Sequence, residues 1–378
     1  MKLAFVVSLY FEYGGMQRTM LRIAQNCVAR GHQVDIYTGG WQGEHPQDIN
    51  VIELDTQAST NVKSNDVLAE KFHAAVSKQQ YDCLVGFTKL PGLDVYYAGD
   101  PCYAARVEYS RPFWYKWTPR YRGFRRQEAA VFAKGLNTQI MLIAHQEKAK
   151  FQHYYKTEEL RFHLLPPGIN VERFAQLPKG DDRRALRAEL NISLYENFIL
   201  LVGSRFKTKG LDRALIAFAA LPDELRNTSK LVVVGGDKQG PYIKQAKQLG
   251  IAEQLVFTGA RDDLVRFYAT ADALVHPAYS ENTGTILIEA MLCGLPQVAS
   301  GACGFAYHVI EAEAGLITPE PFKQSVFNEQ LVKILTSGER VDWHRKGPQY
   351  CQRTDLYSLI DHATDVVIAR ALRNREAL

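Results

Sequence analysis

The chain contains 378 residues, and at roughly 100–200 residues per domain this length predicts two domains. Its 46% hydrophobic and 23% charged residues are typical of globular proteins and exclude a fibrous or disordered chain. The net charge of +4 is small and indicates no particular partner. The six cysteines include no C-x-x-C pair, which favours a reducing compartment and indicates no metal site. No run of about 18 apolar residues is present, so we predict a cytoplasmic protein without a membrane span.

The N-terminal half alternates strand and helix patterns. Residues 3–9 form a continuous apolar run, as expected of a parallel strand that is buried on both faces. Residues 16–30 then have apolar side chains at helical spacing, which predicts an amphipathic helix. The further elements predicted in this half are strands at 34–37, 83–87 and 140–144 and helices at 67–78 and 145–155.

Two prolines and a glycine at 166–168 interrupt this alternation and predict an interdomain hinge, because proline removes a donor and stiffens the chain. The alternation then restarts and predicts a second α/β domain. Its predicted strands are 198–202, 231–234, 273–276 and 297–299, and its helices are 211–220, 241–249 and 285–293. We therefore predict two Rossmann-like, doubly wound domains with a cleft between them, at 1–167 and 168–354, and a C-terminal helix at 355–378 that returns to the first domain.

A glycine loop joins the first predicted strand to the first helix. Gly14 and Gly15 stand immediately before Met16, where the helix pattern begins. Glycine lets a backbone approach a ligand closely, and a helix N-terminus offers free N–H groups, so the loop suits a diphosphate. A tight turn that binds nothing explains the two glycines equally well, because the loop is neither a Walker loop nor G-x-G-x-x-G.

A second glycine loop, residues 203–210, follows the strand at 198–202. It carries Arg205, Lys207 and Lys209 between two glycines. Arginine can bind two phosphate oxygens at once and lysine adds a point charge, so the loop predicts a phosphate clamp. A solvated basic turn is the alternative. The position after a strand favours function, because ligands collect at the carboxyl ends of parallel strands.

The most informative motif contains two glutamates with seven residues between them, Glu281 before a predicted helix and Glu289 on it. Thr285 and Glu289 are four residues apart and therefore share one helical face. The backbone amides at the start of this helix can receive an anion or sugar hydroxyls, and ionised carboxylates accept hydrogen bonds from hydroxyls. The motif thus suits a sugar and a ribose. A capping glutamate and a surface glutamate are the alternative, which the apolar neighbours of Glu289 disfavour.

One segment, residues 106–126, is both basic and aromatic, and Glu108 is its single acid. Basic groups attract anionic lipid at about 1 kcal/mol each near the surface, and Trp and Tyr prefer the headgroup layer. Nucleic-acid binding through base stacking and a solvated helix with buried aromatics are the alternatives. The cations are Arg106, Arg111, Lys116, Arg120, Arg122, Arg125 and Arg126, and the aromatics are Tyr109, Phe113, Trp114, Tyr115, Trp117, Tyr121 and Phe124.

The two glutamates, the earlier Arg and Lys-Gly loop and the N-terminal Gly-Gly loop together resemble the retaining GT-B glycosyltransferases of family 4. Within that family, the chain is similar to the lipopolysaccharide core glucosyltransferases. The similar segments are 13–18, 89–97, 165–169 and 303–308, which run from the first loop nearly to the end. Together they are far more specific than the glutamate pair alone.

The resemblance implies a role for each candidate residue, and among these Asp100, Glu281, Lys209 and Arg205 would serve catalysis. For Asp100, a turn role is the commoner explanation of a loop aspartate. The implied contacts are Gly14 and Gly15 with the donor phosphates, Asp100 with the sugar, Arg205 and Lys209 with the diphosphate, Arg261 with the uracil through its main chain, Glu281 and the backbone of Asn282, Thr283, Gly284 and Thr285 with the donor sugar, and Glu289 with the ribose.

The implied reaction moves an α-hexose, with retention, from a UDP-sugar to an inner-core heptose of lipopolysaccharide. Because that acceptor is a lipid, the resemblance favours docking of residues 106–126 on anionic lipid at the cytoplasmic face of the inner membrane, with no nucleic-acid partner. No Asp-x-Asp is present, so neither a metal nor a cofactor is expected, and cations with helix dipoles would carry the charge.

The sequence is also compatible with other functions. Family members that transfer glucose have alanines where this chain has Asn282 and Thr283, so UDP-galactose and UDP-N-acetylhexosamines remain alternative donors. A GT-B-like nucleotide-sugar epimerase or a phosphorylase would share the fold. A nicotinamide dehydrogenase would need G-x-G-x-x-G, which is missing. A module that only binds a nucleotide sugar or a membrane would show no turnover.

Overall fold

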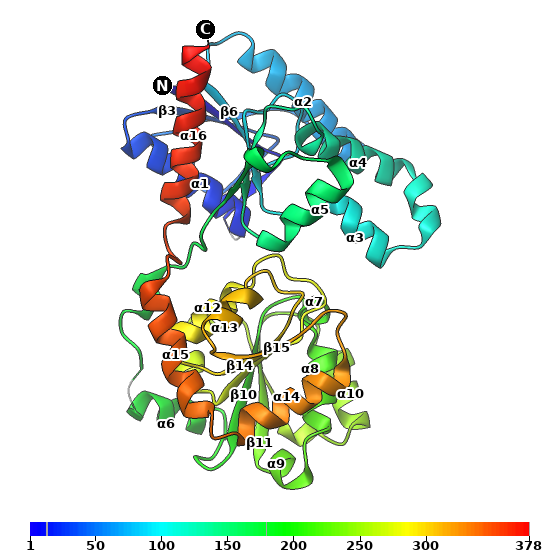
Figure 1. Ribbon diagram of the computed structural model, residues 1–378, viewed down its shortest axis with the longest axis vertical. Helices are drawn as coiled ribbons and strands as arrows, with labels where there is room; N and C mark the ends of the chain where they lie inside the picture. The colour runs from blue at the N-terminus through cyan, green and yellow to red at the C-terminus, as the bar shows by residue number, and fades with distance from the viewer. Residues whose placement is uncertain (13, 179, 378) are drawn as a thin grey trace. The chain divides into compact units, whose positions relative to one another are not determined.

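The computed structural model describes residues 1–12, 14–178 and 180–377, and Tyr13 of the predicted Gly-Gly loop lies outside them. The chain divides into two compact units. Unit 1 consists of Met1–Gly168 and Ser358–Leu378, and unit 2 consists of Ile169–Tyr357. In each unit, helices cover both faces of a parallel sheet (Figure 1). The prediction of two Rossmann-like α/β domains is confirmed.

The described residues of unit 1 form a seven-stranded sheet whose neighbouring strands are all parallel. The first strand lies inside the sheet and later strands are added on both of its sides, which is the doubly wound order. The spatial order is β5 (Asn50–Glu53), β3 (Gln33–Thr38), β1 (Lys2–Val7), β6 (Cys83–Gly86), β7 (Val95–Ala98), β8 (Gln139–Leu142) and β9 (Phe162–Leu164); β2 (Tyr10–Phe11) and β4 (Trp41–Gln42) pair separately.

Apolar helix faces bury this sheet from both sides, which explains why the strands read as continuous apolar runs. Met20 and Val367 contribute to the core on one face, and Phe72, Phe132 and Phe151 contribute to the core on the other. The helices of unit 1 are α1 (Gly15–Ala29), α2 (Asn61–Val76), α3 (Tyr103–Ser110), η1 (Phe113–Trp117), α4 (Pro119–Phe132), α5 (His145–Tyr155), η2 (Glu159–Arg161) and α16 (Leu359–Glu376).

The C-terminal helix α16 is part of unit 1, although unit 2 separates it in sequence from the rest of that unit. It lies beside α1 (Figure 1). Its apolar side, which includes Ala363 and Val367, joins the same core as α1. At the edge of this contact, Arg30, which follows α1, forms ion pairs with Asp361 at 2.9 Å and Asp365 at 2.5 Å.

Unit 2 repeats this architecture, with a six-stranded parallel sheet among its described residues. The spatial order is β12 (Leu255–Gly259), β11 (Ser229–Val234), β10 (Asn197–Val202), β13 (Ala273–His276), β14 (Gln297–Ser300) and β15 (Gly315–Thr318). The helices are η3 (Val171–Phe174), α6 (Gly180–Glu189), α7 (Phe206–Lys209), α8 (Leu211–Ala219), α9 (Asp223–Asn227), α10 (Gly240–Gln248), η4 (Ala252–Gln254), α11 (Leu264–Thr270), α12 (Thr285–Leu292), α13 (Ala306–Glu311), α14 (Gln324–Thr336) and α15 (Arg340–Arg353).

Several predicted bounds were wrong. Helix α2 begins at Asn61 and not at residue 67, because the Thr60 side chain caps it and accepts a hydrogen bond from the Lys63 amide at 3.3 Å. The first strand ends at Val7 rather than at residue 9. The C-terminal helix begins at Leu359 and not at residue 355. Hydrophobic periodicity locates an element but does not detect its exact ends.

Candidate functional site

The predicted site residues of unit 2 lie in the loops and first helical turns that follow strands of its sheet. Strand β10 pairs with β11 on one side and with β13 on the other, so the strand order changes direction at β10. The carboxyl edge at such a switch point is where α/β sheets bind ligands. The loop after β10 carries Arg205 and Lys209, and the loop after β13 carries Glu281. The fold thus brings together residues about seventy positions apart in sequence.

Lys209 and Glu281 form a partly buried ion pair, in which Lys209 Nζ donates to Glu281 Oε2. Their side chains are only 17% and 16% exposed. His276 ends β13, is fully buried, and places its Nε2 3.8 Å from the same glutamate oxygen. Burial raises the pKa of Glu281, but His276 and Lys209 outweigh burial and hold this pKa at about 2. Glu281 is therefore a carboxylate throughout the physiological pH range.

This pKa predicts how Glu281 affects stability. Because its pKa in the fold lies below the ordinary 4.5, Glu281 stabilises the fold above pH 4.5, and this contribution is lost as the pH falls toward 2. We expect the difference in unfolding free energy between wild type and Glu281→Gln, measured in urea, to be smaller at pH 3 than at pH 6 by about 2 kcal/mol. A difference that is equal at both pH values, or larger at pH 3, would contradict the ion pair.

Arg205 differs from the other cations of its loop. Its backbone is left-handed, with φ of 57°, a conformation that costs a non-glycine residue on the order of 1–3 kcal/mol. Its exposed guanidinium forms no ion pair within the described part of the chain. Lys207, by contrast, pairs with Asp212 at 2.6 Å and lies over the Tyr279 ring. Strained backbone combined with an unpaired charge favours a ligand-binding role for Arg205 over a merely solvated turn.

The backbone around the glutamate motif is fixed by the segment that follows β14. Gly304 N donates to Glu281 O at 3.0 Å, and Phe305 N donates to Thr283 O at 2.7 Å. A Cβ atom on Gly304 would lie 1.8 Å from Asn282 O, so no residue other than glycine fits this approach. The loop that carries Glu281 is therefore held in place before any ligand arrives.

Helix α12 follows this loop, beginning after Gly284, which has φ of 87°. Its first N–H groups have no partner within the helix and give its start positive potential, and Thr285 is exposed there. On the same face one turn later, Glu289 accepts a hydrogen bond from Tyr268 Oη at 2.8 Å. Burial raises the pKa of Glu289, which Tyr268 and the nearby Arg173 oppose. Sequence analysis missed Arg173, because it belongs to no motif and only the fold brings it near α12.

Arg261 follows β12, and its side chain is occupied by acidic partners. Its guanidinium pairs with Asp263 at 2.8 Å and with Glu189 at 2.9 Å. Only the main chain of Arg261 is thus available for a ligand without breaking ion pairs. This geometry agrees with a main-chain contact, and the contact itself stays a prediction.

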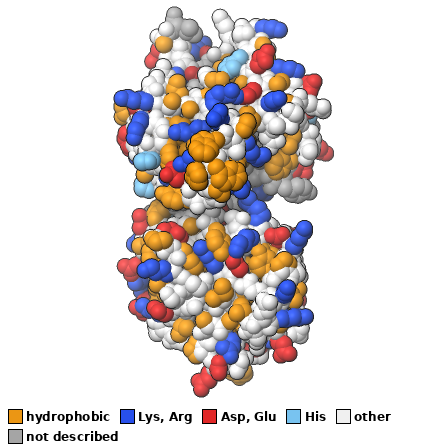
Figure 2. All heavy atoms as spheres, turned by 90° about the vertical axis from the view of Figure 1, so that its right-hand side faces the viewer, with side chains coloured by type: hydrophobic (Ala, Val, Ile, Leu, Met, Phe, Trp, Pro, Cys, Tyr) orange, Lys and Arg blue, Asp and Glu red, His pale blue; other side chains and the backbone are white. Residues whose placement is uncertain are grey.

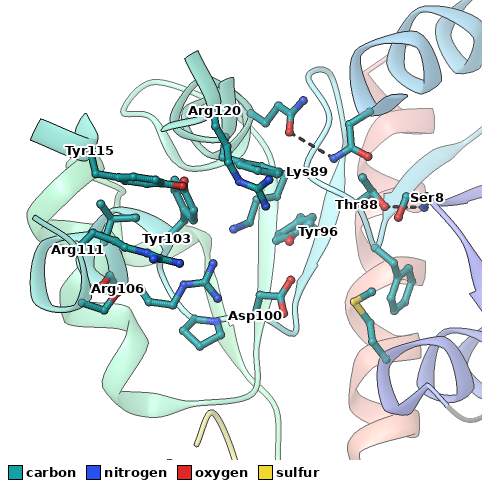
Figure 3. A pocket seen from close by; sticks show the side chains of 18 residues that line it. Ser8, Thr88, Lys89, Tyr96, Asp100, Tyr103, Arg106, Arg111, Tyr115 and Arg120 are labelled. Atoms are coloured by element: carbon teal, nitrogen blue, oxygen red, sulfur yellow. Dashed lines mark hydrogen bonds between the residues drawn. The ribbon is translucent and has the colours of Figure 1, made fainter. Parts of the chain in front are cut away.

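In unit 1, a cavity of about 600 Å³ is lined by Asp100 and not by the predicted Gly14 and Gly15 (Figure 3). Asp100 and Met16, the residue after the glycine pair, both line it. A Cβ atom on Gly15 would meet nothing within 4 Å, so packing does not require glycine there. A Cβ atom on Gly14 would lie 2.1 Å from Gln17 Oε1, so another residue there would require the Gln17 side chain to move.

The basic aromatic segment does not form one surface. It folds as α3, η1 and α4, and its cations separate by environment. Arg106, Arg111 and Arg120 line the cavity of unit 1. The remaining cations are Lys116 paired with Glu108, Arg125 over the Tyr155 ring, Arg126 paired with Asp66, and Arg122, which is exposed.

The aromatic residues of this segment also differ in their environment, since Tyr115 and Phe124 line the cavity and four others are exposed to solvent. Tyr109, Phe113, Trp114 and Trp117 expose between 53% and 86% of their surface. Figure 2 shows large hydrophobic side chains gathered with Lys and Arg side chains on the face from which α3 and α4 project in Figure 1. No helix in the described part of the chain is long and apolar enough to span a bilayer.

Glu128, just beyond this segment, is fully buried and was missed by sequence analysis. It accepts hydrogen bonds from the amides of Tyr103 at 3.0 Å and Ala104 at 3.1 Å, which start α3. Tyr155 Oη and Lys89 Nζ donate to it as well, each at 2.5 Å. Burial raises the pKa of Glu128, but these donors outweigh burial and lower it. In the sequence it looks like one more surface glutamate.

The reaction without a metal stays a prediction from the sequence. Among residues 1–12, 14–178 and 180–377, no three His, Cys, Asp or Glu side chains are grouped in a way that could hold a metal ion. This finding concerns side chains only, and the role of metals in the reaction stays a prediction.

Comparisons with known proteins identify the family. Residues 13–173 match the family described as Glycosyltransferase Family 4, and residues 182–350 match Glycosyl transferases group 1. The lipopolysaccharide glucosyltransferase WaaG of Escherichia coli (strain K12) is 38% identical over 97% of this chain and 98% of its own length. A crystal structure of WaaG, described as a glycosyltransferase involved in lipopolysaccharide biosynthesis, covers 97% of this chain and 99% of its own, with a TM-score of 0.85.

A more distant structure supports the fold alone. Anabaena Alr3699/HepE, solved in complex with UDP, is 18% identical, covers 98% of this chain and all of its own, and has a TM-score of 0.73. Both family matches and the full-length similarity to WaaG agree with the two sheets and their strand order. The chain is thus a glycosyltransferase of family 4 with the GT-B fold, and it belongs to the family of the lipopolysaccharide glucosyltransferases.

Proposed function

We propose that this glycosyltransferase moves an α-hexose, glucose in the first place, from a UDP-sugar to an inner-core heptose of lipopolysaccharide. Similarity to a lipopolysaccharide glucosyltransferase over 97% of the chain supports glucose as the sugar and lipopolysaccharide as the acceptor class. The single observation that carries the proposal is the cluster of Arg205, Lys209 and Glu281 at the switch point of the unit 2 sheet.

In the proposed donor complex, the diphosphate lies between Arg205 and Lys209, near the amides that start α12. Glu281 accepts hydrogen bonds from the sugar hydroxyls, and the backbone N–H groups of residues 282–285 donate hydrogen bonds to the sugar. Glu289 accepts hydrogen bonds from the ribose hydroxyls. Glu281 has a second role in this arrangement, because it fixes the ammonium group of Lys209 within the loop. A lysine that is already positioned loses little entropy when the phosphate arrives.

The chemical step breaks the bond between the sugar and the phosphate. Positive charge develops on the sugar and negative charge on UDP, and cations that bind the developing charge more tightly than the ground state lower the barrier. Retention through a double displacement needs a carboxylate nucleophile beside the anomeric carbon. Glu281 is already engaged by Lys209, which makes it a poor candidate. We therefore propose front-face attack, in which the departing phosphate accepts the proton of the acceptor hydroxyl.

The acceptor is assigned to unit 1, with the enzyme docked on anionic lipid at the cytoplasmic face of the inner membrane. The exposed Tyr109, Phe113, Trp114 and Trp117 support docking, because such rings favour the headgroup layer. The exposed Arg122 adds a charge that attracts anionic lipid. Residues 106–126 would rest on the surface of the bilayer and would not cross it.

A donor panel tests the proposal. Purified enzyme is incubated with UDP-glucose, UDP-galactose, UDP-N-acetylglucosamine or UDP-N-acetylgalactosamine, with and without inner-core lipopolysaccharide, and UDP release is measured. We expect UDP release to be fastest with UDP-glucose and to become faster when the acceptor is present. We expect the rate to stay the same when EDTA is added. Interconversion of UDP-glucose and UDP-galactose without acceptor would indicate an epimerase instead. Absence of UDP binding in calorimetry would contradict the donor site.

A further inference from the structure

Three arginines in the cavity of unit 1 lack an acidic partner. Arg106, Arg111 and Arg120 line this cavity, and none forms an ion pair with a described residue of the chain. Figure 3 shows their side chains directed into the same space, above Asp100 and beside Tyr96. The helices that carry them, α3 and α4, are distant from the proposed donor residues in sequence and belong to the other unit.

Each of these arginines is supported by an aromatic ring. The guanidinium carbon lies 5.5 Å from the Tyr103 ring centre for Arg106, 5.4 Å from that of Tyr115 for Arg111, and 5.5 Å from that of Phe124 for Arg120. Cation–π contacts within about 6 Å are attractive and leave the N–H edge of the guanidinium available for an anion. The rings thereby orient the three cations, which a merely solvated basic surface does not require.

The remaining charges around the cavity leave it electropositive. Lys89 also lines it but is neutralised by Glu128, with 2.5 Å between Nζ and Oε1. Asp100 is the one carboxylate among the described residues that line the cavity, against three arginines without an ion pair. Like charges that share a concave site repel one another, and an oxyanion that accepts from several guanidinium groups relieves this repulsion.

The size of the cavity indicates that the anion is part of a larger ligand. A cavity of about 600 Å³ is typical of sites that enclose a small molecule, and it is lined by Tyr96, Tyr103, Tyr115 and Phe124 in addition to the cations. Aromatic rings pack against sugar rings, and Ser8 and Thr88 offer hydroxyl groups at the other end. A saccharide that carries a phosphate or a carboxylate matches both halves of this lining.

We infer that the cavity of unit 1 binds the acceptor saccharide through an anionic substituent, a phosphate or a carboxylate, which Arg106, Arg111 and Arg120 recognise. This inference rests on the proposed function, which assigns the acceptor to unit 1. It separates two roles within residues 106–126: the exposed aromatic side chains with Arg122 contact lipid, and the three arginines of the cavity select the acceptor.

The test uses the full-length protein with its donor site saturated by UDP, so that added phosphate groups cannot bind there. Calorimetry measures binding of glucose 6-phosphate, with glucose as the uncharged control, to wild type, to Arg111→Gln/Arg120→Gln and to Arg122→Gln. Binding to vesicles of phosphatidylglycerol and phosphatidylcholine is measured for the same proteins. We expect the double variant to lose at least about tenfold in affinity for glucose 6-phosphate, a typical loss for two charge-assisted contacts. Arg122→Gln should bind it as the wild type does.

A third variant, Arg111→Lys/Arg120→Lys, keeps the charges but loses the paired donors, and we expect an intermediate affinity. Equal affinity of wild type and double variant for glucose 6-phosphate, or no binding by the wild type, would overturn the inference. A double variant that loses only vesicle binding would assign the arginines to a lipid headgroup and would also overturn it. Failure of the proposed function is a separate result, namely a wild type that neither binds UDP nor releases UDP from UDP-glucose.

Discussion

Replacement of Lys209 by alanine is expected to lower kcat by about 100- to 1,000-fold, the loss that follows removal of one preorganised group facing a developing anion. The negative charge that forms on UDP would lose its buried cation, while the sugar contacts of the α12 loop would remain. The effect should appear in kcat more than in the KM for UDP-glucose, because the charge is largest in the transition state. Initial rates over a range of donor concentrations measure both constants.

The neighbouring lysine provides the control for this prediction. Lys207 lies on the same short helix, but it is occupied by Asp212, and we expect Lys207→Ala to change kcat less than about threefold, which is within surface effects. Lys209→Ala also leaves Glu281 without its ion pair and can destabilise unit 2. Arg205→Ala avoids this complication, because its guanidinium is exposed and has no acidic partner among described residues. Near-wild-type turnover of both Arg205→Ala and Lys209→Ala would refute the diphosphate site.

Replacement of Glu128 by alanine is expected to lower the free energy of unfolding by about 3–5 kcal/mol, the range for breaking a buried ion pair. The change would leave the amides of Tyr103 and Ala104 without an acceptor at the start of α3, and Lys89 without its counter-charge. Urea titration followed by circular dichroism measures the loss. Because α3 carries Arg106, binding of glucose 6-phosphate should weaken in parallel.

Two further variants define the role of Glu128. Glu128→Gln keeps the shape and most acceptors, so we expect a smaller loss than for alanine. Glu159→Ala removes a carboxylate that is 62% exposed and pairs with Lys148, and we expect a much smaller loss, because solvent screens exposed pairs. If Glu128→Ala and Glu159→Ala cost the same, Glu128 does not organise the start of α3.

Much of unit 2 could be predicted from the sequence because its motifs are local. Strand β10 with the Arg205 loop, and β13 with Glu281 and α12, are each contiguous, so the order of strand, loop and helix is visible in the pattern. Parallel α/β topology then places the loops at one sheet edge. The ion pair between Lys209 and Glu281 depends on a register that the sequence does not specify, and it emerged only from the structure.

Unit 1 was less predictable, because its site depends on contacts between segments that are distant in sequence. Segment 106–126 is a continuous run of cations and rings, and nothing in its periodicity separates Arg120, which lines the cavity, from Arg122, which is exposed. The separation follows from a helix rotation of about 200° between positions two apart, combined with packing against α3. Glu128 escaped notice because its hydrogen-bond partners come from three other segments of the chain.

Helix α16 has a consequence for the order in which the protein matures during synthesis. Unit 2 is complete when residue 357 leaves the ribosome, whereas unit 1 still lacks Leu359, Ala363, Val367 and Ala371 of its core. We therefore expect the nascent N-terminal half to keep an apolar strip beside α1 open to water until residues 359–371 are available. The core of the half that is translated first thus depends on residues that are translated after all of unit 2.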